Sequence, residues 1–360
     1  AGAGSGKTYA LTQKLEELLS TSAVSPAGVI ATTFTRLAAG ELKERVRGKL
    51  IEVGQLSIAN QMEQSLIGTV NGVCGEILRR FAFEAGLPPD QRVVEETQGD
   101  ILFYQAMETA LENNSSLIRK MNATSHRLQI TDSKNQLNWR SEIKDIADAA
   151  RANNQSAAEI RGLGVASSTP FLKYFPAPVS HDLDAGLLGA VNHAISGIDT
   201  DEDTTKTTRE YVSYITGVRA GLIKRRLTWH EWISLSKKMP GVKSKRFAEP
   251  IADIAINYDT NPQLHNDIRY FAEQAFIIAA DSLDAYQRVK TQKGLIDFVD
   301  QEQRLYQLLD NASVKATLAE ELQLLMVDEF QDTSPIQLAL FLKLSRLAEQ
   351  VIWVGDIKQS

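Results

Sequence analysis

Eight residues at the start of the sequence, AGAGSGKT (Ala1–Thr8), combine glycines, a lysine and a threonine at a spacing that suits a phosphate group. The three alternating glycines let the backbone turn tightly and point its N–H groups at one anion. Lys7 is placed to reach the β- and γ-phosphates of a nucleotide, and the Thr8 hydroxyl is placed to bind Mg²⁺. A helix predicted over 7–19 directs its positive N-terminal end at the same phosphates. The structural alternative is a glycine-rich loop before an ordinary helix.

A second group of chemically capable residues follows the apolar run Leu322–Val327. Such a run is typical of a buried parallel strand, and ligands bind at the carboxyl ends of these strands. Asp328 is placed to hold Mg²⁺, directly or through water, and Glu329 to accept a proton from an attacking water. A solvated acidic turn is the alternative for an isolated Asp-Glu pair. Taken with the first segment, the pair predicts a protein that binds and hydrolyses a nucleotide.

Composition bounds the class of protein. The 360 residues are 43% hydrophobic and 23% charged, which suits a globular protein of two or three domains. The single cysteine, Cys74, excludes an internal disulfide and indicates a reducing compartment, so we predict a cytoplasmic location. No apolar run approaches the ~20 residues of a membrane span, and we expect no membrane contact.

The formal net charge of −6 means that a nucleic-acid surface has to be local. Between Arg219 and Phe247 there are nine lysines and arginines and one acid, Glu231, with Trp229 and Trp232 among them. Cations that offset phosphate charge and aromatic rings that stack on bases suit a nucleic-acid contact. The alternative is a solvated helix face whose two tryptophans are core residues.

The order of predicted elements indicates an interrupted α/β fold. Strands at 28–32 and 66–70 alternate with amphipathic helices in residues 1–92, and strands at 322–327 and 351–354 with a helix at 336–347 restore the pattern in residues 291–360. Residues 93–290 are mostly helical in pattern, with helices at 98–112, 141–153 and 267–289 and a polar loop at 197–208. We therefore predict a nucleotide-binding domain in two parts around a helical insertion subdomain.

Several further segments carry recognisable motifs in a fixed order. They are AGAGSGKT, TTFTRLAAGEL (32–42), GTVNGVCGEIL (68–78), GLIDFVD (294–300), VDEFQDTSPIQ and WVGDIKQS. Together they resemble the N-terminal motor region of superfamily 1 DNA helicases of the UvrD/Rep/RecB type, whose matching motifs include TFTNKAA, GTFHxxCxxIL and LDFDDL. The resemblance implies a P-loop, RecA-like parallel sheet with helices on both faces, interrupted by a mostly α-helical insertion. The length of the insertion is similar to that of the RecB branch.

The resemblance also implies ATP and Mg²⁺ as cofactors and adds roles for two glutamines. Gln359 would contact the γ-phosphate and couple its presence to DNA, and Gln331 would join the nucleotide network beside Glu329. The full predicted site has three parts: nucleotide-binding Gly2, Ala3, Gly4, Ser5, Gly6, Lys7, Thr8, Tyr9 and Gln331; catalytic Lys7, Glu329 and Gln359; and metal-binding Thr8 and Asp328.

A path for single-stranded DNA is implied by the same resemblance. Its residues would be Thr33, Phe34, Thr35, Arg36, Thr69 and Asn71, with Phe34 available for base stacking. Asn71 stands where the family carries a histidine. The structural alternatives are that the threonines cap helices and that Phe34 belongs to the core.

The implied function is that of an ATP-dependent 3′-to-5′ DNA helicase, alone or as part of a helicase–nuclease complex, in recombination or repair. It would act on single-stranded and duplex-junction DNA together with partner subunits. The strand that feeds a P-loop and the family's second RecA-like domain have no counterpart in the sequence, so we expect a motor fragment that is nearly inactive alone. Two alternatives are a P-loop phosphotransferase and a non-catalytic, nucleotide-dependent DNA-binding or scaffold module.

Overall fold

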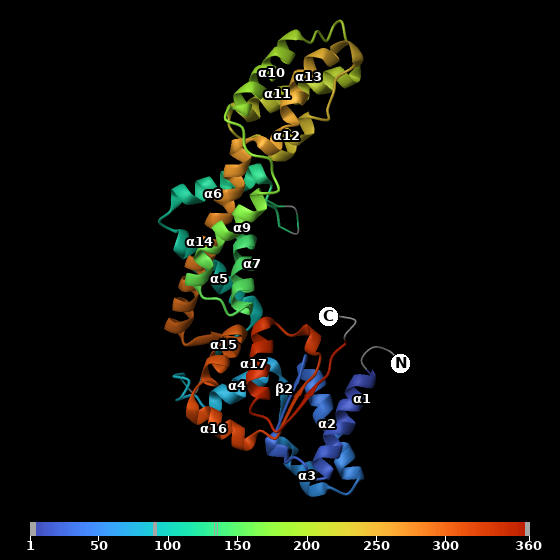
Figure 1. Cartoon of the computed structure of the whole chain (residues 1–360), viewed down its shortest axis with the longest axis vertical. Coiled ribbons are helices and arrows are strands. Elements are labelled where there is room, and N and C mark those ends of the chain that lie inside the picture. The colour runs from blue at the N-terminus through green and yellow to red at the C-terminus, as the bar shows by residue number, and fades with distance from the viewer. Residues whose placement is uncertain (1–4, 89–91, 133, 135, 357–360) are drawn as a thin grey trace. The chain divides into compact units, whose positions relative to one another are not determined.

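The computed structural model describes residues 5–88, 92–132, 134 and 136–356, and for Ser5, Gly6 and Thr8 it describes the backbone alone. The chain divides into two compact units. The first comprises Ala1–Ile101, Arg151–Asn154 and Arg288–Ser360, and the second comprises Leu102–Ala150 and Gln155–Gln287. The first unit contains the sheet drawn in Figure 1.

Four parallel strands form the central sheet of the first unit. They are β1 (Val29–Thr33), β2 (Leu66–Thr69), β5 (Leu324–Val327) and β6 (Gln350–Trp353), in the order β2-β1-β5-β6. The predicted parallel α/β sheet is thereby confirmed. The register pairs Thr33 with Thr69 and Thr32 with Val327, so the carboxyl ends of β1, β2 and β5 lie level. Residues that follow these strands therefore meet at one edge.

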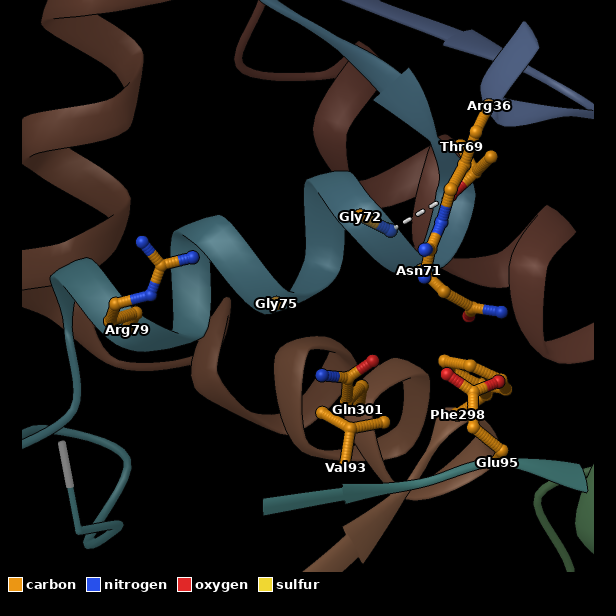
Figure 2. A pocket seen from close by; sticks show the side chains of 10 residues that line it. All are labelled: Arg36, Thr69, Asn71, Gly72, Gly75, Arg79, Val93, Glu95, Phe298 and Gln301. Carbon is orange, nitrogen blue, oxygen red and sulfur yellow. Dashed lines mark hydrogen bonds between the residues drawn. The ribbon is translucent and has the colours of Figure 1, made fainter. Parts of the chain in front are cut away.

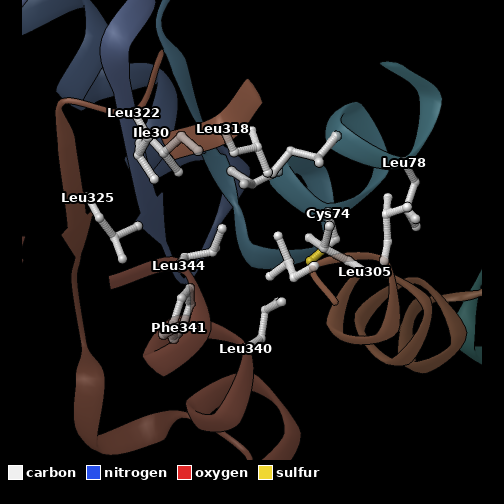
Figure 3. Close-up of a cluster of buried hydrophobic side chains, with 14 of the residues drawn as sticks. Ile30, Cys74, Leu78, Leu305, Leu318, Leu322, Leu325, Leu340, Phe341 and Leu344 are labelled. Atoms are coloured by element: carbon white, nitrogen blue, oxygen red, sulfur yellow. The ribbon is translucent and has the colours of Figure 1, made fainter. Parts of the chain in front are cut away.

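Helices cover both faces of this sheet, because successive side chains of a strand point to opposite faces. Ala31 and Met326 pack on one side with α1 (Ser5–Ser20), α2 (Arg36–Glu52) and α3 (Leu56–Gln61). Ile30 and Leu325 pack on the other with α4 (Val70–Arg80), α15 (Phe298–Leu308), α16 (Ala312–Glu321) and α17 (Pro335–Ser345). Cys74 lies in this second cluster as a small buried hydrophobe, as Figure 3 shows.

A second, two-stranded sheet was not predicted. It pairs β3 (Arg92–Val94) in parallel with β4 (Leu295–Asp297), two segments about two hundred residues apart in the sequence. Each strand has three residues, too few for a period-two pattern to register. The pairing joins the two long segments of the first unit, Ala1–Ile101 and Arg288–Ser360, which are separated in the sequence by the second unit.

Helices make up the second unit. Its described residues include one β pairing, the isolated bridge between Thr131 and Leu137. The helices that lie wholly or mostly in it are α5 (Glu96–Leu111), α6 (Ser115–Leu128), α7 (Trp139–Ala152), α8 (Ala157–Arg161), α9 (Leu163–Leu172), α10 (Leu183–Gly197), α11 (Lys206–Ile223), α12 (Trp229–Leu235), α13 (Lys245–Ala255) and α14 (Pro262–Lys293).

The core of the second unit settles the role of the two tryptophans. Trp229 and Trp232 are buried with ring centroids 5.8 Å apart, and both pack among apolar side chains of α10, α11 and α13. They are core residues and not stacking surfaces for bases. Among the described helices of the chain, none combines the length and the hydropathy needed to cross a bilayer.

Candidate nucleotide and nucleic-acid site

Two of the three predicted catalytic residues, Lys7 and Glu329, meet beside the carboxyl end of β5. The Asp328 backbone N–H donates to the Thr32 carbonyl at 3.0 Å, which extends the pairing of the two strands by one residue. Glu329 follows in a left-handed conformation, φ 51° and ψ 45°, a backbone strain of the kind that gathers at functional sites. The Lys7 ammonium, from the first turn of α1, donates directly to the Glu329 carboxylate.

Gln331 connects this ion pair to the segment that follows β6. Gln331 Nε2 donates to Glu329 Oε2 at 2.7 Å, and Gln331 Oε1 accepts from the Asp356 backbone N–H at 2.8 Å. A Cβ at Gly355 would lie 2.8 Å from Gln331 Oε1, so a larger residue there would displace the amide from this position. The network thus fixes the Glu329 carboxylate from two sides.

The charges of the site follow from these contacts. Hydrogen bonds from Gln331 and from Lys7 lower the pKa of Glu329, and the bond to Glu329 raises the pKa of Lys7. Both groups are therefore charged at neutral pH. Burial raises the pKa of Asp328, so a bound cation would offset the cost of its negative charge.

The donor set around Asp328 fits Mg²⁺ held with a nucleotide. The described residues contain no group of three or more His, Cys, Asp or Glu side chains that would form a protein-only metal cage. Mg²⁺ is commonly bound through one or two carboxylates together with substrate phosphates and water. One half-buried carboxylate beside a lysine is consistent with that arrangement.

The remaining predicted nucleotide residues lie at or before the start of α1. Gly2, Ala3, Gly4 and Gln359 lie outside the described residues. Ser5, Gly6 and Thr8 form the first turn of α1. Tyr9 is exposed, and its hydroxyl accepts from Gln13 Nε2 at 2.8 Å while its ring lies 4.9 Å from Lys49 Nζ. Their nucleotide contacts stay predictions.

The predicted DNA-binding residues follow β1 and β2 at the same edge of the sheet. Thr35 caps α2 by accepting from the Ala38 backbone N–H, and Thr69 caps α4 by accepting from the Gly72 N–H, both at 3.1 Å. Phe34 is 71% exposed, which excludes a core role and leaves its ring open to stacking. The caps explain two of the threonines without DNA, so their contacts with DNA stay predictions.

A cavity of about 340 Å³ lies beside α4 within the first unit. Three of the predicted DNA-binding residues, Arg36, Thr69 and Asn71, line it (Figure 2). Sequence reasoning missed its other walls, although the segment GLIDFVD, which includes Phe298, was the available signal. Those walls are Gly72, Gly75, Arg79, Val93, Glu95, Phe298 and Gln301.

In the basic segment between Arg219 and Phe247 the two tryptophans are buried, but several lysines and arginines are exposed. Lys237, Lys238 and Lys243 are exposed, and so are Lys245 and Arg246. Lys238 Nζ lies 3.7 Å from the Tyr214 ring centroid, and Lys243 Nζ donates to the Glu202 carbonyl at 3.3 Å. A phosphate contact by these cations stays a prediction.

Comparison with known proteins gives the class of this chain. Residues 1–360 match the UvrD/REP helicase N-terminal domain, and the chain belongs to that family. The resemblance seen in its motifs is thereby confirmed.

Individual relatives are similar along the whole chain. The A subunit of an ATP-dependent helicase/nuclease from Listeria monocytogenes serotype 4a (strain HCC23) is 25% identical over 422 residues, covering 100% of this chain and 33% of the relative. Proteins of the same name from Natranaerobius thermophilus and Lactobacillus acidophilus are 21% and 23% identical, again over 100% of this chain and over 32% and 34% of their own lengths. The chain spans about a third of the length of these relatives.

Proposed function

We propose that this chain provides the first RecA-like motor domain of an ATP-dependent DNA helicase or translocase. The observation that carries the proposal is the joining of Lys7, Glu329 and Gln331 at the edge of the sheet where β1 and β2 also present the predicted DNA-binding residues. The same edge of the sheet would then bind the nucleotide and contact single-stranded DNA. Family membership and the names of the relatives support the same activity.

The residues have distinct tasks in this proposal. When bound, ATP with Mg²⁺ supplies the phosphoryl group and the cation that neutralises its charge. Lys7 would turn from Glu329 to the phosphates, and Asp328 with Thr8 would hold the metal. Glu329, released from Lys7 and still held by Gln331, would take the proton of the attacking water. Gln359 would contact the γ-phosphate and couple its presence to the binding of DNA.

The wider organisation is proposed on the same basis. Residues 1–92 and 291–360 would form the motor domain, and residues 93–290 the helical insertion subdomain, which is supported by the helical second unit between Leu102 and Gln287. Movement would run 3′ to 5′ on single-stranded DNA next to a duplex junction. The protein would act in cytoplasmic recombination or repair, with partner subunits of a helicase–nuclease complex.

Lys7→Ala tests the nucleotide site in the full-length protein. Loss of one preorganised donor to the charge that develops in a transition state typically costs about 10²–10³ in rate, so DNA-stimulated ATP hydrolysis should fall by at least that factor. The matched control is Lys14→Ala, an exposed lysine on the same helix whose contact is Glu17. The measurement is steady-state phosphate release with saturating single-stranded DNA, and the control should keep the parent rate.

Two results would contradict the proposal in different ways. Equal rates for Lys7→Ala and the parent would remove Lys7 from the site. A parent that binds DNA in a nucleotide-dependent manner yet releases no phosphate would indicate the scaffold module, and phosphate transfer to a small acceptor would indicate a phosphotransferase.

A further inference from the structure

The cavity beside α4 contains two side-chain amides whose hydrogen-bonding capacity is unused. Gln301 is 6% exposed, lines the cavity, and forms no side-chain hydrogen bond to any residue that the structure describes. Asn71 Oδ1 is buried and likewise lacks a partner among the described residues. Buried polar groups are nearly always paired in folded proteins. The buried, unpaired Asn71 oxygen, with the Gln301 amide at the wall of the same cavity, therefore indicates a ligand that pairs with both.

The surroundings hold these amides in place. Gln301 belongs to α15, whose start is fixed by a capping box between Asp297 and Asp300. A Cβ at Gly75 would lie 3.0 Å from Gln301 Nε2, so the glycine gives the amide its space against α4. Figure 2 shows the Asn71 amide directed toward Glu95 and Phe298, and the Gln301 amide facing Gly75. The two amides thus line one cavity from α4 and α15.

The other residues that line the cavity suit the flat base and the charged phosphate of one nucleotide in single-stranded DNA. Phe298 and Val93 provide apolar surface against which a flat ring can stack. Arg36 is exposed at the cavity, where it can meet a backbone phosphate, and Arg79, which pairs with the Glu76 carboxylate, is exposed at the same cavity. The volume of about 340 Å³ is at the lower end of the range of about 300–1,000 Å³ for small-ligand sites, which suits one base and not a larger group.

The hydrogen-bonding groups also select the kind of base. Asn71 Oδ1 is a buried acceptor without a partner among the described residues, and the exposed Glu95 carboxylate is a second acceptor, so the pair can take two N–H donors. An exocyclic amino group supplies two, whereas uracil and thymine have a single ring N–H. The Gln301 amide can then donate to a ring nitrogen of the same base, as carboxamides do when they read adenine.

We propose that this cavity takes up one nucleobase with an exocyclic amino group from the DNA single strand. The inference rests on the proposed function, because that function places the strand along Arg36, Thr69 and Asn71. It adds a base preference to a track whose other predicted contacts, with the backbone and by stacking on Phe34, do not distinguish one base from another. The strand would be held more tightly at such bases.

The test compares two homopolymers that differ at the pyrimidine 4-position, oligo(dC) and oligo(dU), each of about twelve nucleotides. Binding to the full-length protein is measured by fluorescence anisotropy without ATP. A pair of good base hydrogen bonds discriminates by at least about fivefold, so oligo(dC) should bind about fivefold or more tightly than oligo(dU). Gln301→Leu should abolish the preference, and Gln307→Leu, an exposed glutamine on the same helix, should keep it.

A second variant covers the case in which Gln301→Leu does not fold. Gly75→Val keeps the amide but places a side chain against it, and it should also remove the preference. Equal affinity of the parent for both oligonucleotides, or a preference that survives in Gly75→Val, would overturn the inference while leaving the proposed function intact. Failure to bind either oligonucleotide would contradict the proposed function itself.

Discussion

In the full-length protein, Glu329→Gln should lower the rate of DNA-stimulated ATP hydrolysis by about 10²–10⁴-fold, the contribution expected of a positioned general base. Hydrogen bonds from Gln331 and Lys7 lower the pKa of Glu329, so this carboxylate is ionised at neutral pH, which is the charge state that a general base needs. Glutamine keeps the shape of the side chain but cannot accept that proton. ATP and DNA should therefore still bind, and steady-state turnover and equilibrium binding are measured on the same preparation.

The matched control for this substitution is Glu320→Gln, an exposed carboxylate of α16. It carries the same change of charge and should leave turnover unchanged. If Glu329→Gln turns over within a factor of a few of the parent, Glu329 is not the base. If binding of ATP is lost together with turnover, the residue holds the nucleotide instead of acting on water.

Lys290→Met should cause the largest loss of stability among the changes considered. Lys290 is 0% exposed, and its ammonium contacts Asp297 Oδ2 at 2.8 Å and Asp300 Oδ2 at 2.5 Å. Arg151 Nη2 completes the cluster, at 2.5 Å from Asp297 Oδ1 and 3.1 Å from Asp300 Oδ1. The lysine and the arginine together balance the two buried carboxylates.

Removing one partner of a buried ion pair costs about 3–5 kcal/mol, because the remaining charge stays buried without compensation. The midpoint of urea unfolding should fall accordingly, and hydrogen exchange should quicken in β4, whose last residue is Asp297. Lys293→Met, an exposed lysine one turn further along, should change the midpoint little. Pairing Lys290→Met with Asp300→Asn should recover part of the loss. A midpoint equal to the parent's would show that the cluster does not stabilise the unit.

The central sheet and the contact between Lys7 and Glu329 could be predicted from the sequence, because each depends on a short local pattern of residues. Leu324–Val327 is a continuous apolar run that ends at Asp328, and such a run belongs to a buried parallel strand. Gly6 and Lys7, in the first turn of α1, belong to a glycine-rich pattern that predicts phosphate binding. Those two facts place Lys7 near Glu329 although 322 positions separate them. The start of β5 was placed two residues early because Leu322 caps the carboxyl end of α16, donating its backbone N–H to the Leu318 carbonyl.

Other features depend on contacts that no local pattern records. The sequence of the basic segment is compatible with Trp229 and Trp232 in solvent or in the core. The packing of α10, α11, α12 and α13 shows that they lie in the core. The pairing of β3 with β4 joins strands too short to recognise. Gln301 lies on an amphipathic helix, where a glutamine predicts a solvated position, yet it is buried at the cavity. Neither the burial nor the missing partner of a side chain can be seen before the tertiary structure is known.

The measurement that tests the central claim most directly is strand separation by the full-length protein. A fluorescent duplex is prepared with a single-stranded tail at either its 3′ or its 5′ end, and release of the labelled strand is followed with ATP and Mg²⁺. The motor proposed here should separate the 3′-tailed duplex only when ATP is present, leave the 5′-tailed duplex intact, and lose this activity in Glu329→Gln. Release of neither duplex by a protein that hydrolyses ATP, or equal release without ATP, would contradict the assignment of this chain to a DNA helicase motor.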